Sequence, residues 1–295
     1  MPFLARQVDF RRRTPRFYAR HLALDTLSLL SRRQRLQLAH TPRVQLLCLH
    51  HIFEDEEDSF RKLLNYLTQQ YQVVSYSTAV DAIRNSQINA PTLALSFDDG
   101  FTCCLRAVRI LKEFGLSACF FLPPAILDCQ NDADKIRFCQ DRLKIAPVDL
   151  MGRDEILQLL DQGMEIGYHT QTHPRVSDLL AEHFQQEFEE GRATLESLVG
   201  KVKHFAWPFG QFADFSRQAY EYLASQSYAS IASAERGCHR SGWSGAQTPL
   251  LYRDPIEAHW PIRHIEYFLL RNVTHPELSP EQFARSLPVR GEETT

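Results

Sequence analysis

Short apolar segments alternate with helix-like segments along most of this chain, and this alternation limits the folds it can adopt. We expect buried strands at 44–49, 72–75, 92–97, 117–122, 164–168, 202–207 and 228–232. Helical periodicity predicts helices at 60–67, 78–83, 105–114, 153–160, 179–198, 215–225 and 262–270, whereas residues 129–148 are polar and predict an irregular excursion. Because strands that alternate with helices form parallel sheets, six or seven such units predict one α/β domain built as a closed or nearly closed (β/α) barrel.

Polar side chains follow several of these strands directly. His50 follows the first expected strand, Asp98 and Asp99 follow the third, His169 follows the fifth and Pro208 follows the sixth. The carboxyl ends of barrel strands meet at one rim, where barrel enzymes carry their active sites. We therefore expect these residues to share one functional site.

Charge divides the chain unevenly. Residues 1–43 contain ten arginines and two acidic residues, whereas the remaining residues carry a net charge of −11. The acidic main body disfavours binding to nucleic acid, so we expect no nucleic-acid partner. We predict a basic, helical N-terminal extension over 1–43, a barrel over 44–275 and a polar C-terminal tail over 276–295.

The segment 17–38 of this extension mixes leucines with arginines, and two interpretations remain open. An amphipathic helix lying on anionic lipid has this pattern, and so does a helix that packs on the barrel with a solvated basic face. The sequence shows no secretory-signal or membrane-span pattern, and its seven cysteines form no Cys-x-x-Cys pair, which favours reduced thiols. We expect a cytoplasmic protein that the extension can attach peripherally to the inner face of the membrane. The oligomeric state stays open.

His169 and His173 form the first chemical motif. Two histidines four residues apart on a helical turn present both imidazoles on one side, which is a metal-ligand spacing. Surface or capping histidines are the alternative interpretation. The turn follows an apolar strand directly and ends at Pro174, which favours metal ligands.

Asp98 and Asp99 form the second motif. Adjacent carboxylates at the end of a buried strand repel each other and lose solvation, and a bound cation offsets this cost. One aspartate can then bind the metal while the other accepts a proton, and Gly100 allows a sharp turn. The alternative is an aspartate that caps the helix beginning near Cys103. A set of two histidines and one aspartate leaves positions for water and substrate, and such sites hydrolyse amides or esters.

These motifs resemble those of the polysaccharide deacetylase family, which is named for the NodB homology domain. Four stretches carry the resemblance, which covers about 44–272: LLCLHHI, LALSFDDGF, EIGYHTQTHP and FAWPFG. Their order and spacing match the family. The resemblance implies a distorted (β/α) barrel with about seven parallel strands.

The resemblance also implies roles for the matching residues. Asp98 corresponds to the catalytic base. Asp99, His169 and His173 correspond to the ligands of a divalent metal, for which zinc is the first expectation and cobalt, nickel, manganese or iron are alternatives. Thr170 stands where the family has a residue that braces the histidine loop.

The third family motif corresponds to Pro208, Phe209 and the following glycine. There a backbone N–H at the Phe209 position helps to stabilise the oxyanion. We expect Trp207 and Phe209 to be available for stacking on a sugar face, although each is also a plausible core residue.

Two departures from the family pattern concern proton transfer. Ala206 replaces the arginine that usually orients the base, and the late Leu-x-His motif that usually supplies the general acid has no clear match. Three histidines lie near its expected place without its pattern: His259, His264 and His275. The exopolysaccharide and poly-N-acetylglucosamine deacetylase branch resembles this chain in carrying a histidine after the first strand. This branch implies His50 as the acid, because strand alternation points His51 away.

We thus expect a metal-dependent carbohydrate N-deacetylase that releases acetate from N-acetylated units of a polysaccharide or oligosaccharide. Two alternatives stay open: a deacylase that acts on an intracellular small or lipid-linked amino sugar, and a non-catalytic glycan-binding relative.

Overall fold

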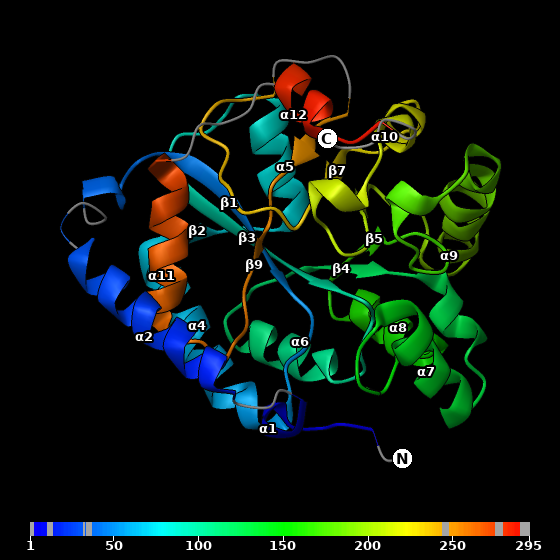
Figure 1. Ribbon diagram of the computed structural model, residues 1–295, viewed down its shortest axis with the longest axis horizontal. Coiled ribbons are helices and arrows are strands. Elements are labelled where there is room, and N and C mark those ends of the chain that lie inside the picture. The colour runs from blue at the N-terminus through cyan, green and yellow to red at the C-terminus, as the bar shows by residue number, and fades with distance from the viewer. Residues whose placement is uncertain are drawn as a thin grey trace.

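The computed structural model describes residues 3–10, 14–31, 33, 37–243, 248–274 and 280–289. In this part of the chain one sheet runs in the order β8-β7-β6-β5-β4-β3-β1-β9, with parallel pairing throughout, and β2 pairs with the beginning of β3. Figure 1 shows the strands crossing the centre of the molecule with helices around them. The strands are β1 (Arg43–Leu49), β2 (Gln72–Val73), β3 (Pro91–Asp98), β4 (Cys119–Leu122), β5 (Glu165–Tyr168), β6 (His204–Ala206), β7 (Ser230–Ala232), β8 (Leu250–Leu251) and β9 (Asp254–Pro255).

This arrangement confirms the predicted α/β barrel class. All seven predicted strands are present, and β8 and β9 are additional. The sequence did not predict β8 and β9, because a strand of two residues is too short to show a periodic pattern. Among the described residues β8 and β9 end the sheet order without pairing with each other, so the sheet is curled but not closed.

The two faces of the curled sheet bury separate sets of apolar side chains. Strand alternation turns Val44, Leu46 and Ala94 to the inner core, whereas Leu47 and Leu95 pack in the outer core under the helices. The same alternation turns Ser96, Asp98 and Cys48 inward, because each follows an inward residue by two positions. The inner face therefore becomes polar at its carboxyl end, where the functional site was expected.

The helices agree with most of the predicted ones, and the helix at Tyr76–Arg84 packs in the inner core whereas the others pack in the outer core. Their bounds are α4 (Glu57–Gln70), α5 (Tyr76–Arg84), α6 (Cys104–Glu113), α8 (Arg153–Asp161), α9 (Gly191–Val199), α10 (Arg217–Ala224) and α11 (Ile262–Arg271). The expectation of an irregular excursion at 129–148 is wrong in part. That region contains α7 (Asp132–Phe138) and a π-helical turn (Cys139–Leu143), because Asn131 caps the helix and Phe138 and Leu143 are buried.

The single helix expected over 179–198 is also wrong, because the structure breaks it. A 3₁₀ turn (Ala181–His183) and a π-helical turn (Gln185–Glu190) precede α9. The backbone carbonyl of Glu187 accepts hydrogen bonds from the Tyr168 hydroxyl at 2.6 Å and from Gln171 N at 3.2 Å. These outside donors occupy a carbonyl that an α-helix would use internally, and the wider turn accommodates them.

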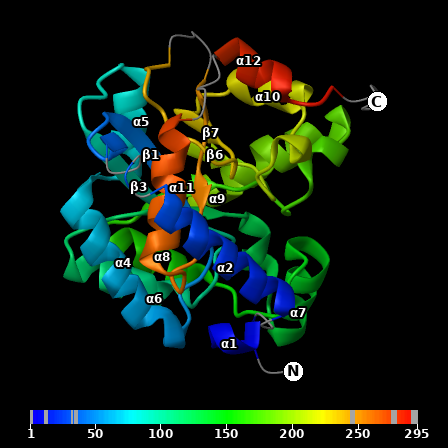
Figure 2. The same ribbon diagram turned by 60° about the vertical axis from the view of Figure 1, so that its left-hand side comes forward.

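The predicted extension and tail both contact the barrel. α1 (Gln7–Phe10) packs beside the 3₁₀ turn at Glu54–Glu56, and α2 (Pro15–Leu30) packs along α11. Figure 2 shows α2 lying at the front of the molecule next to α11. The described part of the predicted tail contains α12 (Pro280–Ser286), whose Phe283 is buried in the outer core. No helix among the described residues has the length and apolarity needed to cross a membrane.

Candidate active site

Asp99, His169 and His173 come together at the carboxyl ends of β3 and β5. Asp99 Oδ1 lies 3.6 Å from His169 Nε2 and 3.2 Å from His173 Nε2, and all three side chains are buried. Asp99 and His173 both have left-handed backbone conformations, with φ of 73° and 58°. Non-glycine residues adopt this region at an energetic cost, and such strain concentrates at functional sites. The structure therefore brings together the three ligands predicted from sequence.

These three residues fit a divalent metal. His169 Nδ1 donates to the Ala206 carbonyl at 2.8 Å, so its Nε2 lone pair faces Asp99. Ligand atoms held about 2 Å from one ion stand roughly 3–3.5 Å apart, which agrees with the distances to Asp99. His173 Nδ1 is buried without a hydrogen-bond partner. If Nε2 binds a metal, Nδ1 carries the single ring proton and the imidazole is neutral. The chemistry of the set, two imidazoles and one carboxylate, suits zinc or a similar ion.

The loop between the two histidines is braced by Thr170 and Glu187. His173 N donates to Thr170 Oγ1 at 3.1 Å, which is the bracing expected at Thr170. The carboxylate of Glu187 accepts from Gln171 N and Thr172 N, each at 3.0 Å, and from the Thr172 hydroxyl at 2.6 Å. Sequence analysis missed Glu187, because it lies in the segment expected as a continuous helix.

Asp98 is held by Arg253, which precedes β9 directly. Arg253 Nη1 donates to Asp98 Oδ1 at 2.7 Å and Nη2 donates to Oδ2 at 2.8 Å, and both side chains are buried. Burial alone would raise the pKa of Asp98, but the charge of Arg253 outweighs it and lowers the pKa below the ordinary value. Asp98 is therefore ionised and fixed in orientation, as a general base requires.

Ala206 replaces the arginine that usually orients the base, and in this structure Arg253, far along the chain, orients Asp98 instead. Arg253 Nε also donates to the Ser233 carbonyl at 2.7 Å, and Nη1 donates to Ser96 Oγ at 3.1 Å. Ala206 itself serves the site through its backbone carbonyl. The sequence offered no signal for Arg253, because its position depends on two strands of two residues each.

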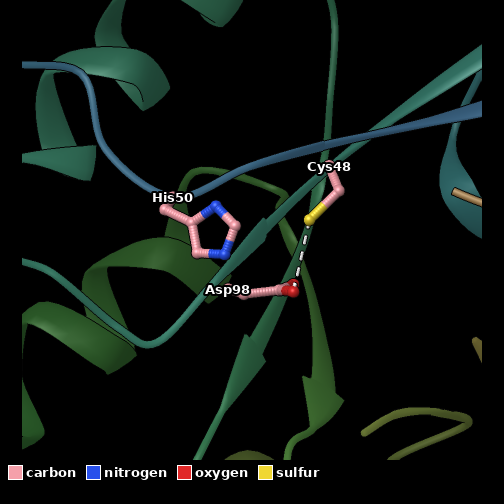
Figure 3. A group of neighbouring side chains, drawn as sticks. All are labelled: Cys48, His50 and Asp98. Atoms are coloured by element: carbon pink, nitrogen blue, oxygen red, sulfur yellow. Dashed lines mark hydrogen bonds between the residues drawn. The ribbon is translucent and has the colours of Figure 1, made fainter. Parts of the chain in front are cut away.

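His50 lies beside Asp98, as Figure 3 shows. Ring nitrogen, carboxylate oxygen and the Cys48 sulfur lie within 4.8 Å of one another, and Cys48 Sγ donates to Asp98 Oδ2 at 3.3 Å. Cys104 Sγ donates to the His50 carbonyl at 3.1 Å. His50 is exposed whereas Cys48 is fully buried. Of His50, Cys48 and Asp98, only His50 is exposed to solvent.

His51 faces away from Asp98, as strand alternation predicted. Its Nδ1 lies 3.0 Å from Glu56 Oε2, and His259 Nδ1 lies 3.1 Å from Glu56 Oε1. Burial alone would raise the pKa of Glu56, but its hydrogen bonds with His259 and His51 lower it to about 2. His264 pairs with Asp25 of α2 at 2.6 Å, and His275 lies outside the described residues.

Of the third-motif residues, Phe209 is exposed beside the site, whereas Pro208 and Trp207 are buried. Phe209 is 37% exposed, has a φ of 63°, and its ring lies 5.1 Å from that of His173. Pro208 is buried. The expectation of a sugar contact from Trp207 is corrected, because its side chain is fully buried, stacks on Phe215 at 4.4 Å and donates to Gln211 O. Trp207 is a core residue that supports the Phe209 turn.

A cavity of about 200 Å³ opens beside His50 and Asp99. Its other walls come from several distant segments: Phe10, His51, Phe101, Ile145, Ile256 and Glu257. Apolar walls around a few convergent polar groups are typical of small-ligand sites. The arrangement offers one acyl-sized space next to a base, an exposed histidine and a potential metal site.

Comparison with known families agrees with this geometry. Residues 85–227 match the family described as polysaccharide deacetylase. This stretch of the chain is therefore similar to a polysaccharide deacetylase domain. The match includes Asp98, Asp99, His169 and His173, and the sheet that positions them extends beyond the matched residues to β1 and β9. Comparison with curated proteins gives no match in sequence.

Three solved structures share the fold of this chain. IcaB from Ammonifex degensii superposes with a TM-score of 0.62 at 18% identity, over 78% of this chain and 97% of that one. The Streptococcus pyogenes deacetylase PplD, in complex with acetate, gives 0.61 at 16%, over 80% and 100%. A de-N-acetylase from Aggregatibacter actinomycetemcomitans gives 0.61 at 19%, over 77% and 99%. These likenesses establish a distorted, NodB-like (β/α) barrel.

Proposed function

We propose that this protein is a metal-dependent carbohydrate N-deacetylase that releases acetate from N-acetylated sugar units. One observation carries the proposal: a carboxylate fixed by a bidentate arginine lies next to a buried set of one aspartate and two histidines at the rim of the barrel. The family match supports hydrolysis of an acetyl group on a carbohydrate. Zinc is the metal we propose first, with cobalt, nickel, manganese and iron as alternatives.

The residues of the chain divide the chemistry among them. A divalent ion, when bound by Asp99, His169 and His173, supplies a Lewis acid that polarises the amide carbonyl and lowers the pKa of water. Asp98 accepts the proton of the attacking water, and Arg253 holds its carboxylate in place. The backbone N–H of Phe209 stabilises the oxyanion.

His50 completes the proton transfer in this proposal. It protonates the leaving amine, which departs as a free amino sugar while acetate is released. Its exposure and its closeness to Asp98 support this role. The late histidines are less suited, because His259 and His264 are engaged with carboxylates away from Asp98.

The second candidate differs in substrate and place: a cytoplasmic deacylase of a small or lipid-linked amino sugar. The arginine-rich extension favours it, because this segment offers a means of reaching the inner face of a membrane. A non-catalytic glycan-binding role is disfavoured, since a binding module gains nothing from a base oriented by a buried arginine.

The test is acetate release from N-acetylglucosamine oligomers, with and without a chelator. We expect activity that a chelator removes and zinc restores, and a loss of at least about 10²-fold in Asp98→Asn. His173→Ala loses activity and bound metal together, whereas His183→Ala, which changes an exposed histidine outside the site, serves as the control. Full activity in Asp98→Asn or His173→Ala refutes the assignment. If no N-acetylated oligomer is hydrolysed, a lipid-linked amino sugar is the next substrate to assay.

A further inference from the structure

Exposed apolar side chains are concentrated on the N-terminal extension. Among the described residues, eight large hydrophobic side chains are exposed, and six of them lie between Val8 and Leu30. Four are more than half exposed on α2, and we call them the α2 apolar face: Tyr18 at 56%, Leu22 at 69%, Leu29 at 72% and Leu30 at 77%. A cluster of this kind marks an interaction surface rather than the scattered exposure of ordinary proteins.

The geometry of α2 separates this face from the one that packs on the barrel. At 100° per residue, the four side chains of this face point within an arc of about 120°. Leu24 and Ser28 point to the opposite side, where they are buried, and Ser28 Oγ donates to the Arg263 carbonyl at 3.1 Å. The helix therefore needs no rearrangement to present its apolar face, and Figure 2 shows α2 at the front of the molecule.

The charged residues of α2 lie at the edges of the apolar face and beyond them. The helix has one acidic residue, Asp25, which accepts hydrogen bonds from Arg263 Nε at 2.5 Å and His264 Nε2 at 2.6 Å. Arg16 and Arg33 are exposed, and Arg20 lies over the Trp260 ring at 4.7 Å. In sequence, further arginines precede and follow the helix at positions 11–13, 32 and 35.

We propose that the α2 apolar face docks onto an anionic lipid surface. Leucines and a tyrosine on one side of the helix, arginines within and around it, and a single acid that is paired with Arg263 and His264 match the chemistry of an amphipathic helix in the headgroup region. A second copy of the chain fits less well, because a symmetric contact through this face would bring the arginines of both copies together.

Docking through α2 also has a consequence for substrate access. Phe10 of α1, in the same extension, lines the cavity beside His50 and Asp99. The N-terminal extension thus carries both the α2 apolar face and one wall residue of the cavity. This connection suits a substrate whose amino sugar is presented at a membrane surface, and the docking itself does not depend on the proposed reaction.

The test is flotation of the full chain with vesicles of phosphatidylcholine alone, or with about one-third phosphatidylglycerol. We expect binding to the anionic vesicles that weakens at high salt. Leu22→Gln combined with Leu29→Gln lowers the partition coefficient at least about tenfold, because two leucines lose their place in the lipid. Arg16→Gln lowers it several-fold. Leu180→Gln, which changes an exposed leucine outside the extension, leaves it unchanged.

Each other outcome overturns the proposal. Absence of binding to both vesicle types, or equal binding by the double variant, removes lipid as the occupant. Self-association without lipid that the double variant abolishes assigns the face to a second copy instead. Because the substituted leucines are exposed, an unchanged thermal melting curve verifies folding. Flotation measures no catalysis, so failure of docking and failure of acetate release are separate results.

Discussion

The pair formed by Arg253 and Asp98 makes the most specific prediction about catalysis. Arg253→Met removes two charge-assisted hydrogen bonds of 2.7 Å and 2.8 Å and leaves Asp98 buried without its counter-ion. Hydrogen bonds to charged groups contribute roughly 1.5–3 kcal/mol each. Breaking one side of a buried ion pair costs about 3–5 kcal/mol of stability. We therefore expect a folded but destabilised protein.

The effect on turnover follows from the pKa of the base. Arg253 lowers the pKa of Asp98, so its removal raises that pKa and leaves less ionised base at mildly acidic pH. We expect kcat/KM to fall on the order of 10²-fold, and the acid limb of its pH profile to move to higher pH. Arg253→Lys keeps the charge but not the two parallel bonds, so a smaller loss of about tenfold is expected.

The assay is acetate release across pH 5 to 9 together with thermal melting, at saturating metal. Arg236→Met is the matched control, because Arg236 is half-buried and pairs with Asp254 rather than with Asp98. It should lower stability without moving the acid limb. If Arg253→Met keeps its kcat/KM within about twofold and its acid limb unshifted, then Arg253 does not position the base and the reasoning fails.

Three further predictions concern the acid, the histidine loop and the response to pH. His50→Gln should lower kcat by about 10²–10⁴-fold while His51→Gln changes it little, and equal losses in steady-state assays would contradict His50 as the acid. Glu187→Gln should weaken zinc binding about ten- to a hundredfold in calorimetric titration, because the loop amides lose a charged acceptor; unchanged affinity would refute the bracing role. Burial lowers the pKa of His239 to about 4, so the folded protein keeps it neutral while the unfolded chain binds a proton below pH 6.5. Stability from this group is complete above pH 6.5 and declines as pH falls toward 4, by about 2 kcal/mol between pH 7 and 5. His239→Gln should remove that part of the slope in urea unfolding, and an unchanged slope would argue against it.

Local patterns in the sequence predict the fold class and the central residues of the site. Apolar periodicity predicts the strands that carry the site, and the rule that barrel enzymes carry their sites at the carboxyl ends of strands predicts Asp98, Asp99 and His169 at one rim. Alternation along β1 also separated the inward His50 from the outward His51. These predictions succeeded because hydrophobic periodicity, strand ends and short motifs are local properties. Residues close together in the sequence determine them.

Only the tertiary structure decided how those residues are supported. Arg253 lies 155 positions from Asp98 in the chain, and two short strands without periodic signal bring it there. Glu187 holds the histidine loop from a segment expected as continuous helix, and Trp207 is turned into the core rather than toward a substrate. For α2, packing on α11 and exposure of leucines proved compatible, although the sequence pattern presented them as alternatives. These supporting contacts depend on which segments, distant in sequence, pack against each other in the fold. Local sequence patterns do not specify such long-range contacts.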